Sequence, residues 1–299
     1  MLDQLDLYDD MAQVGLVGRR SVTFKDGKQV GGRGWTKVVE GLTDTFFDFS
    51  LNIRLKYSEG ILRRRNTELG GTVHALVRLV DMLLDENAED EWKVTVTCAD
   101  FAGETHRVRA KYVVGCDGGS SEVRRLAGIP FEGEDKEDHW VALDHGATRI
   151  GYALSPALFA KYGRKMSQED AVKEAKAAMT PFEVEFETVD WHTVYGVKQH
   201  VAARLQDRER ILLAGDAAHT HSSGSAQGMN TGTHDAVSLG WRLAGVLNGW
   251  YKPGVLASYS TERKVAADTL IANDRVISAL ISGHKPASSE IEERTPTHC

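Results

Sequence analysis

The stretch from Ile211 to Asn230 combines residue types that can bind a polar organic ligand. Four apolar residues, Ile211 to Ala214, predict a short buried strand that ends at Gly215-Asp216-Ala217. A carboxylate at the carboxyl end of a strand can accept a hydrogen bond from a ligand hydroxyl. The segment Gly228-Met229-Asn230 then offers backbone N–H groups and the positive end of a helix dipole. A ligand with a polyol on one side and an electron-rich ring on the other would fit.

A long helix is predicted directly behind this segment. Apolar residues recur at helical spacing from Ala236 to Leu247, and Asn230 or Thr231 can cap the first turn. The unit is therefore strand, acidic residue, loop of small residues, helix. Taken alone, Asp216 also suits the plain end of a strand and the glycines suit ordinary turns, so the interpretation depends on the combination.

A second strand-end motif lies earlier in the chain. Residues 110–116 predict an apolar strand that ends at Asp117-Gly118-Gly119. The glycines permit a tight turn, Ser121 can cap a helix beginning near Glu122, and Arg124 can meet phosphate oxygens. An ordinary strand–turn–helix connection is the alternative for this motif.

Two other chemistries receive less support from the same region. Serines near His219 and His221 would suit a hydrolase, but no G-x-S-x-G elbow occurs. The His-x-His spacing would suit a metal, but no third ligand accompanies it, so we expect no metal site. No residue can be assigned as a catalytic acid or base.

Composition narrows the class of protein further. The 299 residues carry 36 Lys and Arg against 43 Asp and Glu, a formal net charge of −7, which argues against a general nucleic-acid surface. Three widely spaced cysteines indicate a reducing compartment without structural zinc. No run reaches the length of a membrane span and no leader is recognisable, so we expect a cytoplasmic protein.

The remaining segments predict mixed α/β structure. An amphipathic helix is expected over 2–11, a hairpin around Asp26-Gly27, and a helix capped by Ser58 after a strand over 51–56. Gly31-Gly-Arg-Gly34 is interpreted as a loop. Further elements are expected as strands over 91–97, 106–109, 182–189, 191–195 and 197–201, and as helices over 156–162, 167–179 and 256–281.

Together these motifs resemble a known family. Gly215-Asp-Ala-Ala-His219, Gln227-Gly-Met-Asn230 and Trp241-Arg-Leu-Ala244 are similar to the second flavin motif of the para-hydroxybenzoate hydroxylase superfamily of FAD-dependent aromatic-ring monooxygenases. The likeness is greatest to the phenol 2-monooxygenase-like branch. Asp117-Gly118 resembles the Asp-Gly motif of the same family. One departure is Ser222-Ser223, because much of the superfamily has a proline after the histidines.

The resemblance implies FAD and NADPH as cofactors. In that family the strand-end aspartate, here Asp216, binds the ribityl chain, and the helix start at Gly228, Met229 and Asn230 faces the flavin pyrimidine. The Asp-Gly turn faces the pyrophosphate and the nicotinamide donor, which implicates Asp117, Gly118, Ser121 and Arg124. Arg54 matches a strand arginine near the flavin, although Leu55 stands where glutamine is expected. Tyr195 and Gln199 suit either the substrate side or core packing.

The resemblance also implies an incomplete fold. No strand with G-x-G-x-x-G precedes residue 20, so the N-terminal glycine-loop unit and the C-terminal thioredoxin-like domain of relatives are expected to be lacking. We expect an α/β protein, an incomplete three-layer, glutathione-reductase-like FAD-binding domain with a shortened substrate-binding β-sheet region. The expected divisions are a partial FAD-binding domain (1–130), a substrate region (131–200), the second flavin motif with C-terminal helices (201–285) and a flexible tail (286–299).

The implied activity is FAD- and NAD(P)H-dependent hydroxylation of a small phenolic molecule, of the kind found in secondary metabolism. The alternative is a non-catalytic remnant that acts as a binding or interaction module. We expect a small aromatic substrate as partner, no nucleic acid and no membrane span, and we leave a homodimer open.

Overall fold

The structure, a computed structural model, describes residues 1–31, 40–41, 44–145, 148–224 and 226–281. Contacts divide the chain into two compact units: unit 1 comprises Met1–Ala75, Val141–Tyr152 and Lys165–Thr193, and unit 2 comprises Leu76–Trp140, Ala153–Arg164 and Val194–Cys299. The expected boundaries at 130/131 and 200/201 both fall inside unit 2. Most of the expected loop over 31–34 and of the expected tail from residue 286 lies outside the described residues.

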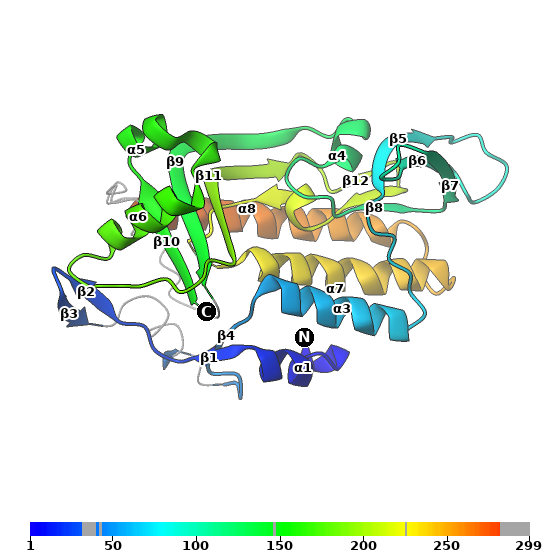
Figure 1. Cartoon of the computed structure of the whole chain (residues 1–299). Helices are drawn as coiled ribbons and strands as arrows, with labels where there is room; N and C mark the ends of the chain where they lie inside the picture. Colours follow the sequence, from blue (N-terminus) through cyan, green and yellow to red (C-terminus); the bar gives the residue numbers. More distant parts are fainter. Residues whose placement is uncertain (32–39, 42–43, 146–147, 225, 282–299) are drawn as a thin grey trace. The chain divides into compact units, whose positions relative to one another are not determined.

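A small sheet in unit 2 brings the two predicted strand ends to one edge (Figure 1). Its strand order is β12 (Gln206–Asp207), β13 (Ile211–Leu213) and β8 (Val113–Gly115). β13 pairs parallel to β8, with Leu212 opposite Val114. Parallel strands end at the same side of a sheet, so the turns that begin at Cys116 and Ala214 are neighbours. Within the described residues, β8 is an edge strand of this sheet.

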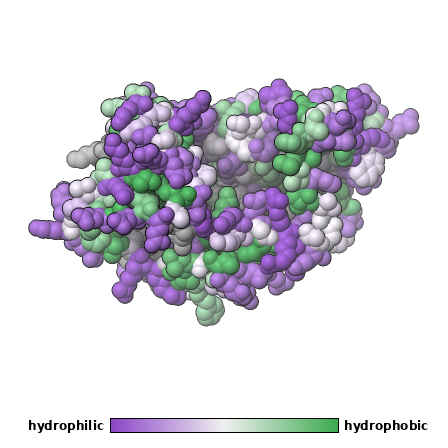
Figure 2. Space-filling model, viewed as in Figure 1, coloured by the Kyte–Doolittle hydropathy of each residue, from purple (hydrophilic) through white to green (hydrophobic). Residues whose placement is uncertain are grey.

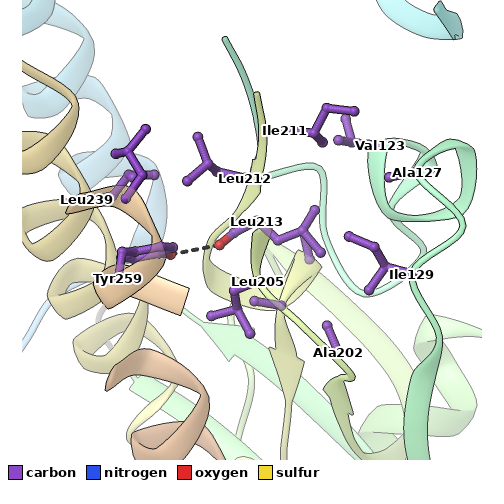
Figure 3. Close-up of a cluster of buried hydrophobic side chains, with 13 residues drawn as sticks. Val123, Ala127, Ile129, Ala202, Leu205, Ile211, Leu212, Leu213, Leu239 and Tyr259 are labelled. Carbon is purple, nitrogen blue, oxygen red and sulfur yellow. Dashed lines mark hydrogen bonds between the residues drawn. The ribbon is translucent and has the colours of Figure 1, made fainter. Parts of the chain in front are cut away.

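Two long helices pack on this sheet, α7 (Gly228–Leu247) and α8 (Val255–Ile281). Arg242 of α7 is buried and joins them, because its guanidinium donates to Ser258 at 2.9 Å and to Glu262 at 2.6 Å. Figure 3 shows Leu239 and Tyr259 directed toward β13 in the hydrophobic core. The whole cluster consists of Val123, Ala127, Ile129, Ala202, Leu205, Ile211, Leu212, Leu213, Ala217, Ala218, Leu239, Leu256 and Tyr259.

Other elements of unit 2 form an antiparallel meander and part of a second sheet. The meander has the order β5 (Arg78–Leu84), β6 (Val94–Ala99) and β7 (Thr105–Ala110), and α4 (Glu122–Leu126) lies near it. The second sheet has the order β10 (Thr148–Leu154), β9 (Phe131–His145), β11 (Trp191–Ala202) and β14 (His219–Thr220), and its three longer strands have residues in both units. The short helices α5 (Pro156–Tyr162), η2 (Gly163–Lys165) and η3 (Gly215–Ala217) complete the elements with residues in unit 2.

Unit 1 is built around a smaller apolar cluster of Leu7, Met11 and Ile61. Its helices are η1 (Asp3–Leu5), α1 (Tyr8–Val14), α3 (Leu55–Glu68) and α6 (Gln168–Ala178), and its strand pairs are β1 (Leu16–Gly18) with β4 (Ser50–Asn52) and β2 (Thr23–Lys25) with β3 (Lys28–Gly31). Asp26 and Gly27 both have positive φ, as a two-residue hairpin turn requires.

Several predicted elements are confirmed and others need correction, among them the strand expected over 51–56, because β4 ends at Asn52 and α3 begins at Leu55. The helix over 156–162 and the helix capped by Ser167 are present. The expected cap Ser58 instead lies inside α3, where its hydroxyl donates to the Leu55 carbonyl. α7 begins at Gly228 rather than at 230 or 231, the first helix is broken at the left-handed Asp6, and residues 182–189 form no strand. Alternation alone was a poor guide there, because a strand also needs a neighbour to pair with.

The described residues contain no helix that is both long and apolar enough to cross a bilayer. Polar residues cover much of the face drawn in Figure 2, with apolar patches between them.

We predict that Tyr259→Phe lowers the free energy of unfolding by about 1–3 kcal/mol. The Tyr259 hydroxyl is fully buried and donates to the Leu213 carbonyl at 2.7 Å, so the change leaves that buried oxygen without its donor. Burial also raises the pKa of Tyr259 far above its ordinary value, so the group stays a donor at every accessible pH. Urea unfolding measures the loss; Tyr251→Phe, on an exposed side chain, is the control and should cost much less.

Candidate functional site

Asp216 lies where the sequence analysis expects it, in the short helix η3 that follows β13. The residue is exposed and its carboxylate accepts no hydrogen bond from the described residues. Gly215, immediately before it, has φ of +59°, a left-handed conformation that favours glycine. The chain therefore turns sharply at the strand end and leaves a carboxylate that is free to accept from a ligand.

A cavity of about 380 Å³ lies beside this carboxylate. Its floor is the ends of β8 and β13, and one wall is a face of α7 made mostly of small residues. A side chain added at Gly232 would begin 3.8 Å from the Cα of Gly215, so α7 passes close to the turn. The lining residues are Val114, Cys116, Ala214, Gly215, Asp216, Gly232, Ala236, Leu239, Gly240 and Leu243.

Among the described residues, no side chain at the N-cap position bonds with the first N–H groups of α7. Gln227 occupies the N-cap position and makes no capping hydrogen bond. Met229 is 49% exposed and Asn230 is also exposed, so the first turn faces outward. An uncapped N-terminus of a 20-residue helix attracts an electron-rich or anionic group.

Asp235 of α7 has a fully buried carboxylate, which connects α7 to the turn at Gly215, to His219 and to α8. Its Oδ2 accepts from the Gly215 N–H at 2.9 Å and from His219 Nε2 at 2.7 Å, while Oδ1 accepts from Arg263 Nε at 2.6 Å. Burial by itself raises the pKa of Asp235, but the hydrogen bonds and charges of these partners outweigh it and hold the pKa below its ordinary value. The ionised carboxylate thus fixes the turn that carries Asp216.

The second predicted motif forms a tightly bonded turn. Asp117 accepts from the Ser121 hydroxyl and from the backbone N–H groups of Glu122 and Val123, at 2.7 and 3.1 Å for the latter two. Ser121 caps α4 as predicted, since its hydroxyl accepts from the Arg124 N–H. Gly118 has φ of +86°, which again favours glycine.

Arg124 has a structural role that the sequence did not reveal. Its side chain is buried and donates to the carbonyls of Ala217 at 2.8 Å and Gly119 at 2.7 Å. Its Cζ atom lies 3.7 Å from the centroid of the Phe131 ring. It therefore ties the Asp117 turn to η3. Burial lowers the pKa of this guanidinium and the charge of Asp117 opposes that effect. A contact of Arg124 with phosphate oxygens stays a prediction.

Arg54 belongs to unit 1, whereas the other predicted site residues belong to unit 2. It is the N-cap residue of α3 and pairs with Asp190 at 3.0 Å. Its predicted place near a flavin stays a prediction.

Other residues named from the sequence have definite partners. Gln199 is fully buried and donates to Asp274, so of its two predicted roles the structure shows core packing. The Tyr195 hydroxyl lies 2.8 Å from the Ser223 hydroxyl. His219 is bonded to Asp235 and His221 to the Ser222 carbonyl. The described residues contain no group of three side chains suited to a metal ion.

Cys116 is a site residue that the sequence analysis missed. It lines the cavity and is exposed to solvent, yet the partial desolvation of its thiol, followed by the charges of Asp117 and Asp235, raises the pKa of that thiol. The thiol is therefore protonated and weakly nucleophilic at neutral pH. Its position between β8 and Asp117 was the available signal.

We predict that Asp235→Asn costs about 3–5 kcal/mol of folding stability at pH 7, because it leaves Arg263 and two further donors without a carboxylate. A lowered folded-state pKa contributes stability above the ordinary value of 3.8 and loses it as the pH falls through the folded-state value. The difference in the free energy of unfolding between wild type and variant should therefore become smaller below about pH 4. Urea unfolding across pH measures it.

The matched control is Asp268→Asn, which removes an exposed carboxylate paired with Lys264 on α8. That change should cost under about 0.5 kcal/mol. Equal costs for the two variants would contradict the role assigned to Asp235.

Known proteins resemble this chain over most of its length. The family described as "FAD binding domain" matches residues 1–155 and 157–274. The chain is 30% identical over 285 residues to the 3-hydroxybenzoate 4-monooxygenase of Comamonas testosteroni, covering 79% of this chain and 44% of that protein. It is 32% identical over 267 residues to the rifampicin monooxygenase of Streptomyces venezuelae, covering 80% of this chain and 54% of that protein.

Among solved structures, the OxyS anhydrotetracycline hydroxylase from Streptomyces rimosus is similar with a TM-score of 0.75 and 26% identity, over 94% of this chain and 59% of that one. The chain thus spans about half the length of the curated relatives that it matches. The matched segments include both strand-end turns and the start of α7. The chain belongs to the FAD-binding domain family of the FAD-dependent aromatic-ring monooxygenases.

Proposed function

We propose that this chain binds FAD and serves in the NAD(P)H-dependent hydroxylation of a small phenolic molecule. The observation that carries the proposal is the unpaired, exposed carboxylate of Asp216 beside a cavity and an uncapped helix start. Matched relatives named as a 3-hydroxybenzoate 4-monooxygenase and an anhydrotetracycline hydroxylase support the class of reaction.

The donor and acceptor set suits this cofactor. Asp216, with Gly215 and Ala217 shaping its turn, would accept from a ribityl hydroxyl. The N–H groups of Gly228, Met229 and Asn230 would face the pyrimidine oxygens. Asp117, Gly118, Ser121 and Arg124 would lie toward the pyrophosphate. When bound and reduced by NADPH, the flavin supplies the oxygen-transfer chemistry, and the chain supplies binding and orientation.

The helix dipole contributes most when the bound ring carries negative charge. The positive end of α7 favours such charge by roughly 0.3–2 kcal/mol. Val114, Leu239 and Leu243 form an apolar lining of the cavity beside Asp216, and this lining limits the access of water to the part of the cofactor bound there. No side chain is assigned as acid or base toward the phenol.

We predict that Asp216→Ala weakens FAD binding about tenfold to a hundredfold, since a charge-assisted hydrogen bond is worth about 1.5–3 kcal/mol. Titration of the apoprotein with FAD, followed by flavin fluorescence, measures this. Asp268→Ala, another exposed carboxylate of unit 2, should leave the affinity unchanged. Wild-type protein that stays colourless and ignores added FAD would favour a non-catalytic binding module instead.

We also predict that FAD protects Cys116 from alkylation. In a Cys98→Ser, Cys299→Ser background, N-ethylmaleimide should react slowly at pH 7 and faster as the pH rises, because the pKa of the Cys116 thiol is raised. Bound FAD should slow the reaction in proportion to occupancy, since Cys116 lines the cavity. A matched chain that keeps only Cys98 should react equally with and without FAD; an unprotected Cys116 would place the cofactor elsewhere.

A further inference from the structure

The loop formed by the described residues 221–224 and 226–227 lies between the two halves of the proposed cofactor site. Asp216 lies before this loop and the first turn of α7 lies directly after it. Two adjacent serines, Ser222 and Ser223, stand in its first half, and each has a specific partner outside the loop.

Ser222 uses every polar atom it has. Its backbone N–H donates to Asp274 Oδ2 at 2.7 Å and its hydroxyl donates to Asp274 Oδ1 at 2.6 Å. The same hydroxyl accepts from the Gly224 N–H at 3.2 Å, and the Ser222 carbonyl accepts from His221 Nδ1 at 2.7 Å. A proline at this position would lack the N–H and the hydroxyl, so it could make neither bond to Asp274.

Asp274 of α8 is fully buried and has no arginine or lysine partner among the described residues. The other two buried aspartates do have such partners: Asp207 pairs with two arginines and Asp235 with one. The Asp274 carboxylate is satisfied instead by Ser222 and by Gln199 Nε2 at 2.8 Å. The imidazole of His221 lies nearby, with Nδ1 4.0 Å from Asp274 Oδ1. Because a buried carboxylate is costly without donors, the two Ser222 bonds are strongly held.

Further contacts hold the loop on either side of Ser222. The Ser223 hydroxyl bonds with that of Tyr195 on β11. His221 Nε2 is buried without a described partner and lies 3.6 Å from where a Cβ on Gly228 would be. The imidazole therefore sits against the first residue of α7, and glycine there leaves room for it.

We propose that Asp274 is a positioning residue for the first turn of α7, acting through Ser222. This inference rests on the proposed FAD site. A binding group gains affinity when its donors are held in place before the ligand arrives. Here a carboxylate on the 27-residue helix α8 fixes the loop, and the loop fixes the N–H groups of Gly228, Met229 and Asn230 relative to Asp216.

The test is a graded series at one position. Ser222→Ala keeps the N–H bond to Asp274 and loses the hydroxyl bond, whereas Ser222→Pro loses both. FAD affinity should fall about threefold to tenfold for alanine and further for proline. Ser222→Thr keeps both donors and should bind as wild type. Asp274→Asn keeps one acceptor oxygen and replaces the other by an amide donor, so FAD affinity should fall at least as far as in Ser222→Ala.

The matched control is Ser260→Ala. The Ser260 hydroxyl, also on α8, accepts from the buried Leu205 N–H at 3.0 Å, far along the helix from Asp274. This variant should lose stability in urea without losing FAD affinity. A general structural weakening would lower affinity in both serine variants equally, and that outcome would overturn the inference.

A cofactor-free measurement separates this inference from the proposed function. Hydrogen exchange should show protected amides at Ser222 and at Thr231, whose N–H donates to the Gln227 carbonyl at 2.8 Å. Both amides should exchange faster in Ser222→Ala and Asp274→Asn. If wild type binds no FAD yet shows this pattern, the proposed function fails and the positioning stands. Unprotected Ser222 in wild type, or FAD binding that ignores the whole series, would refute the positioning role.

Discussion

The geometry of unit 2 depends on one buried negative charge, the carboxylate of Asp235. A charged group removed from water is strongly destabilising unless donors surround it, and here a backbone N–H, an imidazole and a guanidinium do so. Those donors come from η3, from β14 and from α8. The carboxylate itself belongs to α7. Four separate elements therefore have a low-energy arrangement only when they meet at this point.

That arrangement explains why a second carboxylate remains available. Because the Gly215 N–H is directed to Asp235, the next residue, Asp216, lies at the outside of the turn and keeps its oxygens unpaired. Arg124 supports the same turn from the other side through the Ala217 carbonyl. The buried charges hold the backbone in place, and the exposed charge is the one left for a ligand. In the same way, the buried carboxylate of Asp274 holds Ser222 in the loop before α7.

The local parts of this site could be predicted from sequence, and the long-range parts could not. Strand, turn and helix around Asp216 follow from hydrophobic period and glycine placement, and Ser121 caps α4 as its spacing indicates. By contrast, the partners Ser222 and Asp274 are 52 residues apart, and nothing in either local pattern links them. Arg124 was expected to contact phosphate because of its residue type. In the structure its guanidinium packs on the Phe131 ring and donates to two backbone carbonyls. The start of α7 was placed too late because a polar residue that could cap a helix does not have to do so.

β8 lies at one edge of its three-stranded sheet within the described residues, and this position has a consequence for a ligand in the cavity. Val114 of this strand and the adjoining Cys116 also line the cavity. A small molecule bound there would lie against the carboxyl end of β8, so its binding would also stabilise the folded sheet against unfolding.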